Sequence, residues 1–391
     1  MPADRPTALA AAPPALTLVE SWPRETDLDH PAIPDTAEVW LAMIDDAERT
    51  IDLAAFYGAT APGSPLEPIL DALARAAARG VRLRGIFDAK FHARDPAVVD
   101  RLRALPGAEI RVFDLEARTG GVMHAKYFVV DGDDAFLGSP NLDWRSLVHI
   151  QELGLRIREP ALVAGLAELF AADWALAGGA SIDALRRPRV ARSEVRVDYR
   201  GQPVTAELVA SPPGLLVDES TWDLPRLLAA IDGARARVRL SFLNYARIGH
   251  DGQRFDDLDL ALRRAAGRGA RVELMVADWN LRPGGLDDLR ELARVPGVEV
   301  RFVTIPPASA GFIPFARVIH AKSIIVDGEL AWIGTSNGSG DYFTRSRNVG
   351  LLVRGAAFAA DVEAVFLDLW RGPHAHRLDP DAAYAPPRVA E

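Results

Sequence analysis

The first 180 residues alternate between two hydrophobic patterns. Short apolar runs bounded by Gly, Asp or Pro are typical of buried strands, and apolar residues three and four positions apart are typical of amphipathic helices. In residues 35–50, for example, Val39 and Met43 share one face, and Asp35 is placed to cap the first turn. Such alternation indicates an α/β fold with a mostly parallel sheet covered on both faces. The patterns predict strands at 16–21, 51–57, 81–88, 108–114 and 150–157, and helices at 35–50, 66–80, 96–107 and 159–176.

The same series of patterns starts again in the second part of the chain. Residues 208–213 (LVASPP) repeat 18–23 (LVESWP), and residues 238–245 repeat the strand that begins at 51. We therefore expect two fused, pseudo-symmetric halves, each a mostly parallel mixed sheet flanked by helices, with a common interface and a cleft between them. The predicted division is a disordered tail at 1–16, a first half at 17–190, a connector at 191–205, a second half at 206–378 and a tail at 379–391.

The most specific repeat is polar. The frame H-x-K-x4-D-x6-G-[ST]-x-N occurs twice, with every position of the second copy 196 residues after the first. The first copy is expected to form two strands joined by an acidic turn, with His124 and Lys126 on one face of the leading strand. Two matched copies predict one duplicated site, half of it from each repeat. The members are His124, Lys126, Asp131, Gly138, Ser139 and Asn141, then His320, Lys322, Asp327, Gly334, Thr335 and Asn337.

This pair of motifs resembles the two H-x-K-D motifs of the phospholipase D superfamily. In that superfamily the motifs meet across a pseudo-two-fold axis to make one phosphodiesterase site. The resemblance covers roughly residues 17–378 and implies two phospholipase-D-like halves. Short sequence segments within and around the motifs are more similar to the lysosomal 5′-exonuclease branch and its poxviral relatives than to the membrane-anchored cardiolipin synthases. These segments are LVES (18–21), DWRSL (143–147), QELG (151–154), GTSN (334–337) and DYFT (341–344).

The residue types suit phosphodiester chemistry. A phosphodiester is an anion that resists attack, so a site must supply a nucleophile, a proton for the leaving oxygen and cations around the non-bridging oxygens. The resemblance implies that one histidine attacks phosphorus to form a covalent phosphohistidine, while the other protonates the leaving group and then activates water. Four side chains are expected to bind the phosphoryl oxygens: Lys126, Lys322, Asn141 and Asn337. Four others are expected to fix turns and loops: Asp131, Asp327, Ser139 and Thr335.

The two repeats differ at one polar position beyond the shared frame. Glu152 stands 28 residues after His124, whereas Asn348 stands 28 residues after His320. A carboxylate that accepts the ring N–H raises the basicity of a histidine, and a neutral amide does so less. We therefore predict that Glu152 orients His124 as the nucleophile and that His320, beside Asn348, is the general acid/base. An ordinary strand-end carboxylate is the alternative for Glu152.

The small number of lysines points to one more candidate substrate-binding residue outside the two motifs. Of 45 basic residues only three are lysine, and two of them occupy the motif positions. The third, Lys90, follows the strand at 81–88, and strand ends are where open α/β sheets bind ligands. We expect Lys90 to contact a second phosphate or the substrate terminus, with a solvated surface lysine as the alternative. Trp144, Tyr342 and Phe343 follow the motif asparagines and are candidates to stack on a base or cap an acyl chain, or to belong to the core.

Composition limits the function. A net charge of −9 argues against a broad basic surface for duplex DNA or an anionic bilayer. Apolar runs stay short of eighteen residues, which predicts no transmembrane anchor. The leading interpretation is a metal-independent phosphodiesterase, without a cofactor, that acts on single-stranded nucleic acid ends. The alternatives are phospholipase D hydrolysis or head-group transfer on a phospholipid substrate, and a non-catalytic binding protein on the same fold. No metal is expected, because the remaining histidines lack ligand spacing: His30, His92, His250, His374 and His376.

Overall fold

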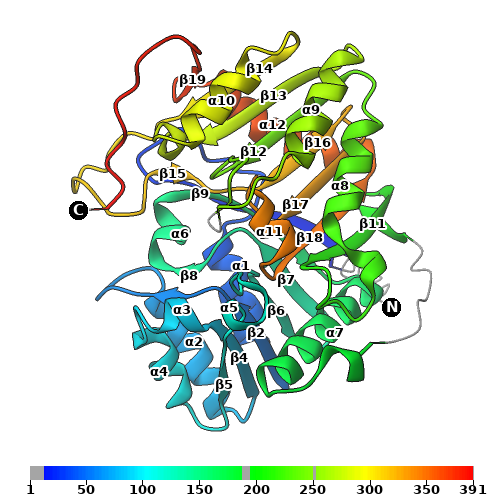
Figure 1. Cartoon of the computed structure of the whole chain (residues 1–391). Coiled ribbons are helices and arrows are strands. Elements are labelled where there is room, and N and C mark those ends of the chain that lie inside the picture. Colours follow the sequence, from blue (N-terminus) through cyan, green and yellow to red (C-terminus); the bar gives the residue numbers. More distant parts are fainter. Residues whose placement is uncertain (1–12, 187–193, 250–251, 391) are drawn as a thin grey trace, which may run out of the picture.

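The computed structural model describes residues 13–186, 194–249 and 252–390. The first half of the chain forms the lower part of the molecule in Figure 1 and the second half the upper part. The strands of the first half are β1 (Leu16–Ser21), β2 (Thr50–Ala55), β3 (Gly58–Ala59), β4 (Arg82–Asp88), β5 (Glu109–Phe113), β6 (Tyr127–Val130), β7 (Asp134–Gly138), β8 (Leu142–Asp143) and β9 (Ile150–Ile157). Its helices are α1 (Thr36–Asp45), α2 (Glu67–Ala78), α3 (Ala89–His92), α4 (Ala97–Arg103), α5 (Glu116–Thr119), α6 (Trp144–Val148) and α7 (Pro160–Ala177), followed by a 3₁₀ turn, η1 (Ile182–Ala184).

The second half repeats this series. Its strands are β10 (Val195–Tyr199), β11 (Gln202–Ser211), β12 (Arg237–Phe242), β13 (Arg271–Ala277), β14 (Val298–Val303), β15 (Val318–Ile319), β16 (Ser323–Val326), β17 (Leu330–Gly334), β18 (Asn348–Arg354) and β19 (Ala375–Arg377). Its helices are α8 (Asp223–Asp232), α9 (Asp257–Gly267), α10 (Gly285–Ala293), α11 (Gly340–Thr344) and α12 (Ala356–Arg371), with 3₁₀ turns η2 (Glu219–Thr221) and η3 (Asp278–Asn280).

The two main sheets have the same strand order. The first runs β1-β9-β7-β6-β2-β4-β5, and the second contains β11-β18-β17-β16-β12-β13-β14, extended by β10 at one edge and β19 at the other. Each strand of the first series therefore has a counterpart at the same place in the second. The prediction of two pseudo-symmetric α/β halves is confirmed.

Both sheets are mixed, as expected, but the expectation that they are mostly parallel is wrong, because antiparallel pairs outnumber parallel pairs in each. Parallel pairing is confined to β2-β4-β5 and β12-β13-β14 within the main sheets, where helices connect successive strands. Each motif forms a hairpin, β6-β7 or β16-β17, and a short turn can join strands only in the antiparallel sense. Strands β1, β9, β11 and β18 extend the antiparallel part.

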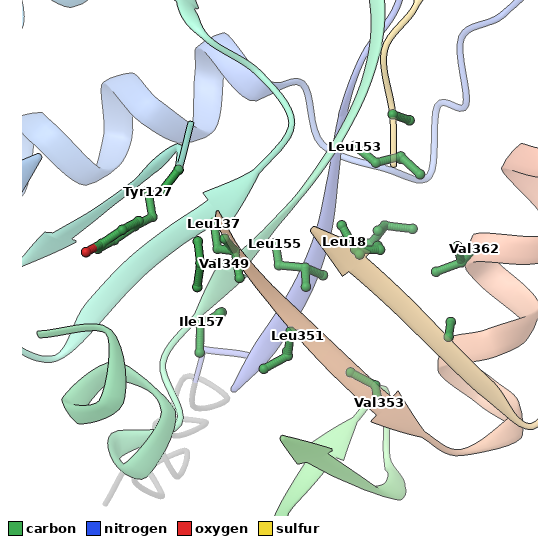
Figure 2. Close-up of a cluster of buried hydrophobic side chains, with 14 of the residues drawn as sticks. Leu18, Tyr127, Leu137, Leu153, Leu155, Ile157, Val349, Leu351, Val353 and Val362 are labelled. Atoms are coloured by element: carbon green, nitrogen blue, oxygen red, sulfur yellow. The ribbon is translucent and has the colours of Figure 1, made fainter. Parts of the chain in front are cut away.

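Side chains from both halves share one central hydrophobic core. Strand β9 contributes Leu153, Leu155 and Ile157 to it, and β18 contributes Val349 and Leu351 from the other half. Figure 2 shows these side chains facing one another between the two sheets. Intervening residues point to the opposite faces, as strand geometry requires, where separate cores form under α1 and α2 in the first half and under α8 and α9 in the second. The shared core makes each half a poor candidate for independent folding.

Backbone pairing also crosses between the halves. Strand β15 of the second half pairs in parallel with the start of β9 in the first, with Val318 opposite Ile150. A parallel bridge joins Met123 to Arg347 in the same way. Each motif segment is thus hydrogen-bonded to the other half just before its histidine.

Two predicted boundaries need correction. The connector 191–205 contains β10 and the start of β11, which form a hairpin at the edge of the second sheet. The N-terminal tail is also shorter than predicted, whereas the C-terminal tail keeps its predicted bounds but packs on the second half. Leu16 is buried in β1, and residues 379–390 lie without regular secondary structure along the second half, where Val389 accepts a hydrogen bond from the Phe315 N–H. The first twelve residues of the N-terminal tail lie outside the described residues.

Helix α7 is long and apolar enough to cross a membrane by length and composition alone. In the structure it packs on the first sheet, with half of its residues buried. Its apolar character is therefore that of a core helix.

Candidate active site

The motif histidines lie on extended segments that precede their hairpins. Strand β6 begins at Tyr127, so His124 and Lys126 are not inside it as predicted, and the second motif behaves in the same way before β16. Both segments are instead held by the other half of the molecule. The His124 N–H donates to the Arg347 carbonyl at 2.9 Å, and the His320 N–H donates to the Gln151 carbonyl at 2.8 Å.

This exchange reverses the predicted partners of the two rings. His124 Nδ1 lies 2.8 Å from Asn348 Oδ1, and His320 Nδ1 lies 2.7 Å from Glu152 Oε2. Because Glu152 follows Gln151 and Asn348 follows Arg347, each histidine meets the residue next to its own backbone acceptor in the other half. The expectation that Glu152 orients His124 is therefore wrong, and the carboxylate belongs to His320.

The ring of His124 has a defined orientation. The Asn348 amide nitrogen donates to the Tyr342 carbonyl at 2.7 Å, and its oxygen accepts a hydrogen bond from the Thr335 hydroxyl at 2.9 Å. This leaves Asn348 Oδ1 as an acceptor, so His124 Nδ1 must carry a proton. His124 Nε2 is then the atom available for proton transfer.

The hydroxyl residues of the two motifs play equivalent structural roles. The Leu153 N–H donates to Ser139 Oγ at 3.0 Å, and the Val349 N–H donates to Thr335 Oγ1 at 3.1 Å. Each hydroxyl thus fixes the strand that carries a histidine partner, as a loop-holding role requires.

The lysines and asparagines are buried beside the histidines. The ammonium group of each lysine, Lys126 or Lys322, donates to the carbonyl of the histidine two residues earlier. The carboxamide oxygens of Asn141 and Asn337 are buried without a hydrogen-bond partner. A buried polar atom without a partner is costly in a purely structural role and is common where a ligand binds.

Burial sets the electrostatics of the site. It lowers the pKa of His320 to about 4 against the opposing effect of Glu152, and it lowers the pKa of Lys322 to about 7. Burial and the charges of both lysines hold the pKa of His124 well below its usual value, and the pKa of Lys126 is lowered in the same way by burial and Lys322. For Glu152, burial raises the pKa, but His320 and Lys322 bring the net pKa below the usual value. The site therefore favours an anion that would compensate its positive charges.

The motif aspartates hold the strand next to each hairpin. Both have positive φ angles, 52° for Asp131 and 53° for Asp327, and a glycine with positive φ follows each, as in a type I′ turn. The Asp131 carboxylate accepts three backbone N–H groups from residues 48–50, and Asp327 does the same with residues 235–237. These contacts match the turn-fixing and anchoring role expected for both residues.

The sequence reasoning missed a buried ion pair that supports the His124 side. Arg347 and Asp173 of α7 are both fully buried, with Arg347 Nε 2.9 Å from Asp173 Oδ1. The same guanidinium donates to the carbonyls of Ser211 and Leu215. Arg347 thus ties α7 to the segment whose carbonyl receives the His124 N–H. The sequence did contain one sign of this ion pair, because Asp173 is an aspartate among the apolar residues of a predicted helix, where a buried charge needs a partner.

The remaining candidates separate into two groups. Tyr342 lies in the site, with the centroid of its ring 4.8 Å from that of the His124 ring. Phe343 is buried in the core of the second half, and Trp144 packs beside the first-half core with its ring against His149. Those positions favour the structural alternative for both. Lys90 is half-exposed on α3 and forms an ion pair of 2.9 Å with Glu116.

The site is therefore one duplicated set of histidine, lysine and asparagine, assembled across two equivalent α/β halves. The family described as "Cardiolipin synthase, PLD-like domain" matches residues 40–174 and 227–370, one segment in each half. The chain belongs to the phospholipase D superfamily and is a phosphodiesterase of that superfamily.

Among curated proteins the chain is similar to two exonucleases. It is 33% identical over 396 residues to the 5′-3′ exonuclease PLD3 of Bos taurus, covering 93% of this chain and 80% of that protein. It is 32% identical over 367 residues to the 5′-3′ exonuclease PLD4 of Mus musculus, covering 86% and 73%. Among solved structures, phosphatidylserine synthase of Haemophilus influenzae Rd KW20 shares the fold, with a TM-score of 0.63 and 14% identity over 88% of this chain and 85% of that one.

Removing one member of the buried ion pair should be costly. The substitution Asp173→Asn leaves Arg347 charged, buried and without its carboxylate, so the free energy of unfolding should fall by about 3–5 kcal/mol. Denaturant titration measures this. The control is Asp71→Asn, which breaks the exposed Arg101–Asp71 pair and should cost no more than about 1 kcal/mol. Equal small effects would contradict a structural role for the buried pair.

Proposed function

We propose that the protein is a metal-independent exonuclease that shortens single-stranded nucleic acid from the 5′ end through a covalent phosphohistidine. The observation that carries the proposal is the joining of both motifs across the halves, with each ring held at Nδ1 so that Nε2 is free. The relatives named as 5′-3′ exonucleases support the substrate and the polarity. Within residues 13–186, 194–249 and 252–390, no three His, Asp or Glu side chains are grouped to hold a metal. The proposed mechanism uses the side chains of the two motifs.

The ring partners assign the roles in the opposite sense to the sequence-based prediction. Attack through Nε2 places positive charge on the imidazole, and an ionised carboxylate at Nδ1 stabilises that charge more than a neutral amide does. His320, bonded to Glu152, is therefore the nucleophile. His124, bonded to the amide of Asn348, gives up a proton more readily and is the general acid.

The reaction then has two steps. In the first, the lone pair of His320 Nε2 attacks phosphorus, the bond from phosphorus to the leaving oxygen breaks, and that oxygen takes the proton of His124 Nε2. In the second, His124 removes a proton from water, the water oxygen attacks phosphorus, and the P–N bond breaks to return neutral His320. Lys126, Lys322 and the two asparagines stabilise the charge on the non-bridging oxygens in both steps.

Phospholipid hydrolysis or head-group transfer is the second candidate. The support for this candidate is the description of the matching family, which names cardiolipin synthase, an enzyme of phospholipids. The histidines, lysines and asparagines of the two motifs suit the phosphodiester group that both substrates share.

Activity should persist in EDTA. We expect the protein to shorten single-stranded oligonucleotides labelled at either end in excess EDTA, with label at the 5′ end released first, and to leave phosphatidylcholine vesicles intact. Gel analysis of both labelled strands and release of choline measure the two activities side by side. Loss of nuclease activity in EDTA with rescue by a divalent ion would exclude the two-histidine mechanism, and choline release without nuclease activity would favour the lipid enzyme.

Substitution of each histidine separates their roles. His320→Ala should form no covalent adduct, whereas His124→Ala should accumulate one from a p-nitrophenyl phosphodiester, because p-nitrophenolate leaves without protonation. On oligonucleotides, His124→Ala should lower turnover by about 10²–10⁴-fold. Intact-mass measurement under non-acidic conditions detects the adduct. An adduct that forms in His320→Ala and maps to His124 would reverse the assignment.

The pH profile should be displaced toward acid. His320 must be neutral to attack, so kcat/KM should fall below pH about 4, where the ring takes a proton. It should also fall as pH rises through the pKa of His124, which lies well below its usual value, because the ring then lacks the Nε2 proton that the leaving oxygen takes. A further loss is expected above pH about 7, where Lys322 loses the charge that attracts phosphate. Glu152 raises the pKa of His320, so Glu152→Gln should move the acid limb to lower pH and slow the reaction. Initial rates at low substrate concentration measure the profile, and an acid limb that does not move in Glu152→Gln would contradict the His320–Glu152 pairing.

A further inference from the structure

A group of aromatic rings from the first half lies on the His124 side of the site, where Tyr342 of the second half also contacts the His124 ring. Phe56 contacts the His124 ring edge-on, with ring centroids 4.8 Å apart, and its own ring lies 4.0 Å from Phe91. Tyr57 stacks on Phe91 at 5.7 Å with an interplanar angle of 22°. We call Phe56, Tyr57 and Phe91 the aromatic pad.

The pad is not part of a hydrophobic core. None of its three residues joins the core clusters of the described structure, and all three remain partly exposed. The pad is nevertheless fixed in place. The Tyr57 hydroxyl donates to Asp143 at 2.9 Å, and Asp88 accepts from both the Phe91 N–H and the Met123 N–H, next to His124.

The fold does not need these rings. Strands β2 and β12 occupy equivalent places in the two sheets, so Phe56 and Tyr57, which follow β2, correspond to Leu243 and Asn244. Strands β4 and β13 are equivalent in the same way, so Phe91 corresponds to Asn280. Asn280 there makes structural hydrogen bonds, to the Leu243 and Ala277 carbonyls and from the Tyr245 N–H. Rings beside a reactive histidine in one half therefore point to a function of that side of the site.

Cations accompany the pad. Lys126 Nζ lies 4.9 Å from the centroid of the Phe56 ring, and the Arg94 guanidinium lies 5.1 Å from that of Phe91. Lys90 precedes Phe91 on α3 and is half-exposed. Flat rings interleaved with cations suit a nucleobase and its phosphates, because base–aromatic stacking and backbone charge combine in single-strand binding. An acyl chain would gain nothing from these charges.

We propose that the aromatic pad stacks on the nucleobase that adjoins the scissile phosphate on the leaving-group side. This proposal rests on the proposed function. The pad contacts His124, and His124 is the group that protonates the leaving oxygen, so the nucleoside that carries this oxygen lies nearest to the pad. Stacking there positions the phosphodiester between the histidines without reading the base, since every base presents a flat face.

The test compares oligonucleotides that differ by one base. Phe91→Leu and Phe56→Leu keep an apolar side chain but remove the ring face, and each should raise KM on a single-stranded oligonucleotide by roughly 5- to 150-fold with little change in kcat. Mass spectrometry of the released product shows which nucleoside carries the leaving oxygen. With a tetrahydrofuran abasic residue at that nucleoside, the wild type should already show the raised KM, and the variants should add nothing to it. An abasic residue on the other side of the phosphate should leave the effect of the variants intact.

The matched control is Phe302→Leu. Phe302 is also partly exposed and also contacts a histidine ring, His376 at 5.4 Å, but it lies on β14 near the far edge of the second sheet. This variant should have the KM of the wild type on every oligonucleotide. Unchanged KM in both pad variants, or the same fold-increase whether or not the base is present, would overturn the proposal.

An equilibrium measurement separates this proposal from the proposed function. In a His320→Ala background, which prevents turnover, 2-aminopurine placed at the predicted nucleoside should lose fluorescence on binding, and Phe91→Leu should restore it. Quenching that persists in Phe91→Leu, or that is missing altogether, overturns the pad. If the wild type shortens no oligonucleotide but releases choline from vesicles, the proposed function fails as well, and the missing quenching then excludes a nucleobase as the ligand.

Discussion

Four hydrogen bonds between the halves, two from each motif histidine, determine the whole site. Each motif histidine donates its backbone N–H and presents its ring N–H to consecutive residues of the opposite half: Arg347 and Asn348 for His124, and Gln151 and Glu152 for His320. Neither ring has its orienting partner unless both halves are assembled. The shared core of β9 and β18 maintains that assembly, because the strands that carry Glu152 and Asn348 are also the strands that pack at the interface. Packing and catalytic geometry are therefore set by the same two strands.

The site concentrates positive charge where solvent cannot compensate it. His124, His320, Lys126 and Lys322 are each at least nine-tenths buried, and Glu152 is the carboxylate that contacts a catalytic ring. Burial makes the charged forms of all four costly, which is why the pKa of every one is lowered. A phosphodiester anion among them offsets that cost and raises these pKa values again, so the unbound site is poised to gain free energy from the phosphate itself. A net charge of −9 over the whole chain does not oppose this, since the attraction acts at short range inside the protein.

The sequence was sufficient for the repeat, the two motifs and most strands and helices, because these follow from local patterns that recur after 196 residues. It was not sufficient for the partners of the rings. The interval of 28 residues from His124 to Glu152 describes positions along one half, whereas the pseudo-two-fold arrangement places the partner in the other. The ion pair of Arg347 and Asp173 joins residues 174 positions apart, and a hairpin of ordinary polar composition concealed β10 in the predicted connector. The ring partners and the ion pair depend on contacts between residues far apart in the sequence, which no local pattern contains.

The two halves share the strand order of their main sheets, so we look for functional differences at the positions where the repeats diverge near the site. One divergence is Glu152 against Asn348, which gives one histidine a charged partner and the other a neutral one. Another is Phe56, Tyr57 and Phe91 against Leu243, Asn244 and Asn280, which places aromatic rings on the side of the neutral partner. In the proposed mechanism the two divergences act in the same sense: a nucleophile stabilised by charge on one side, and a proton donor with an aromatic surface beside the leaving group on the other. Because a symmetric site would bind a phosphodiester equally well in both orientations, coupling these two differences is what would give the cleavage a direction.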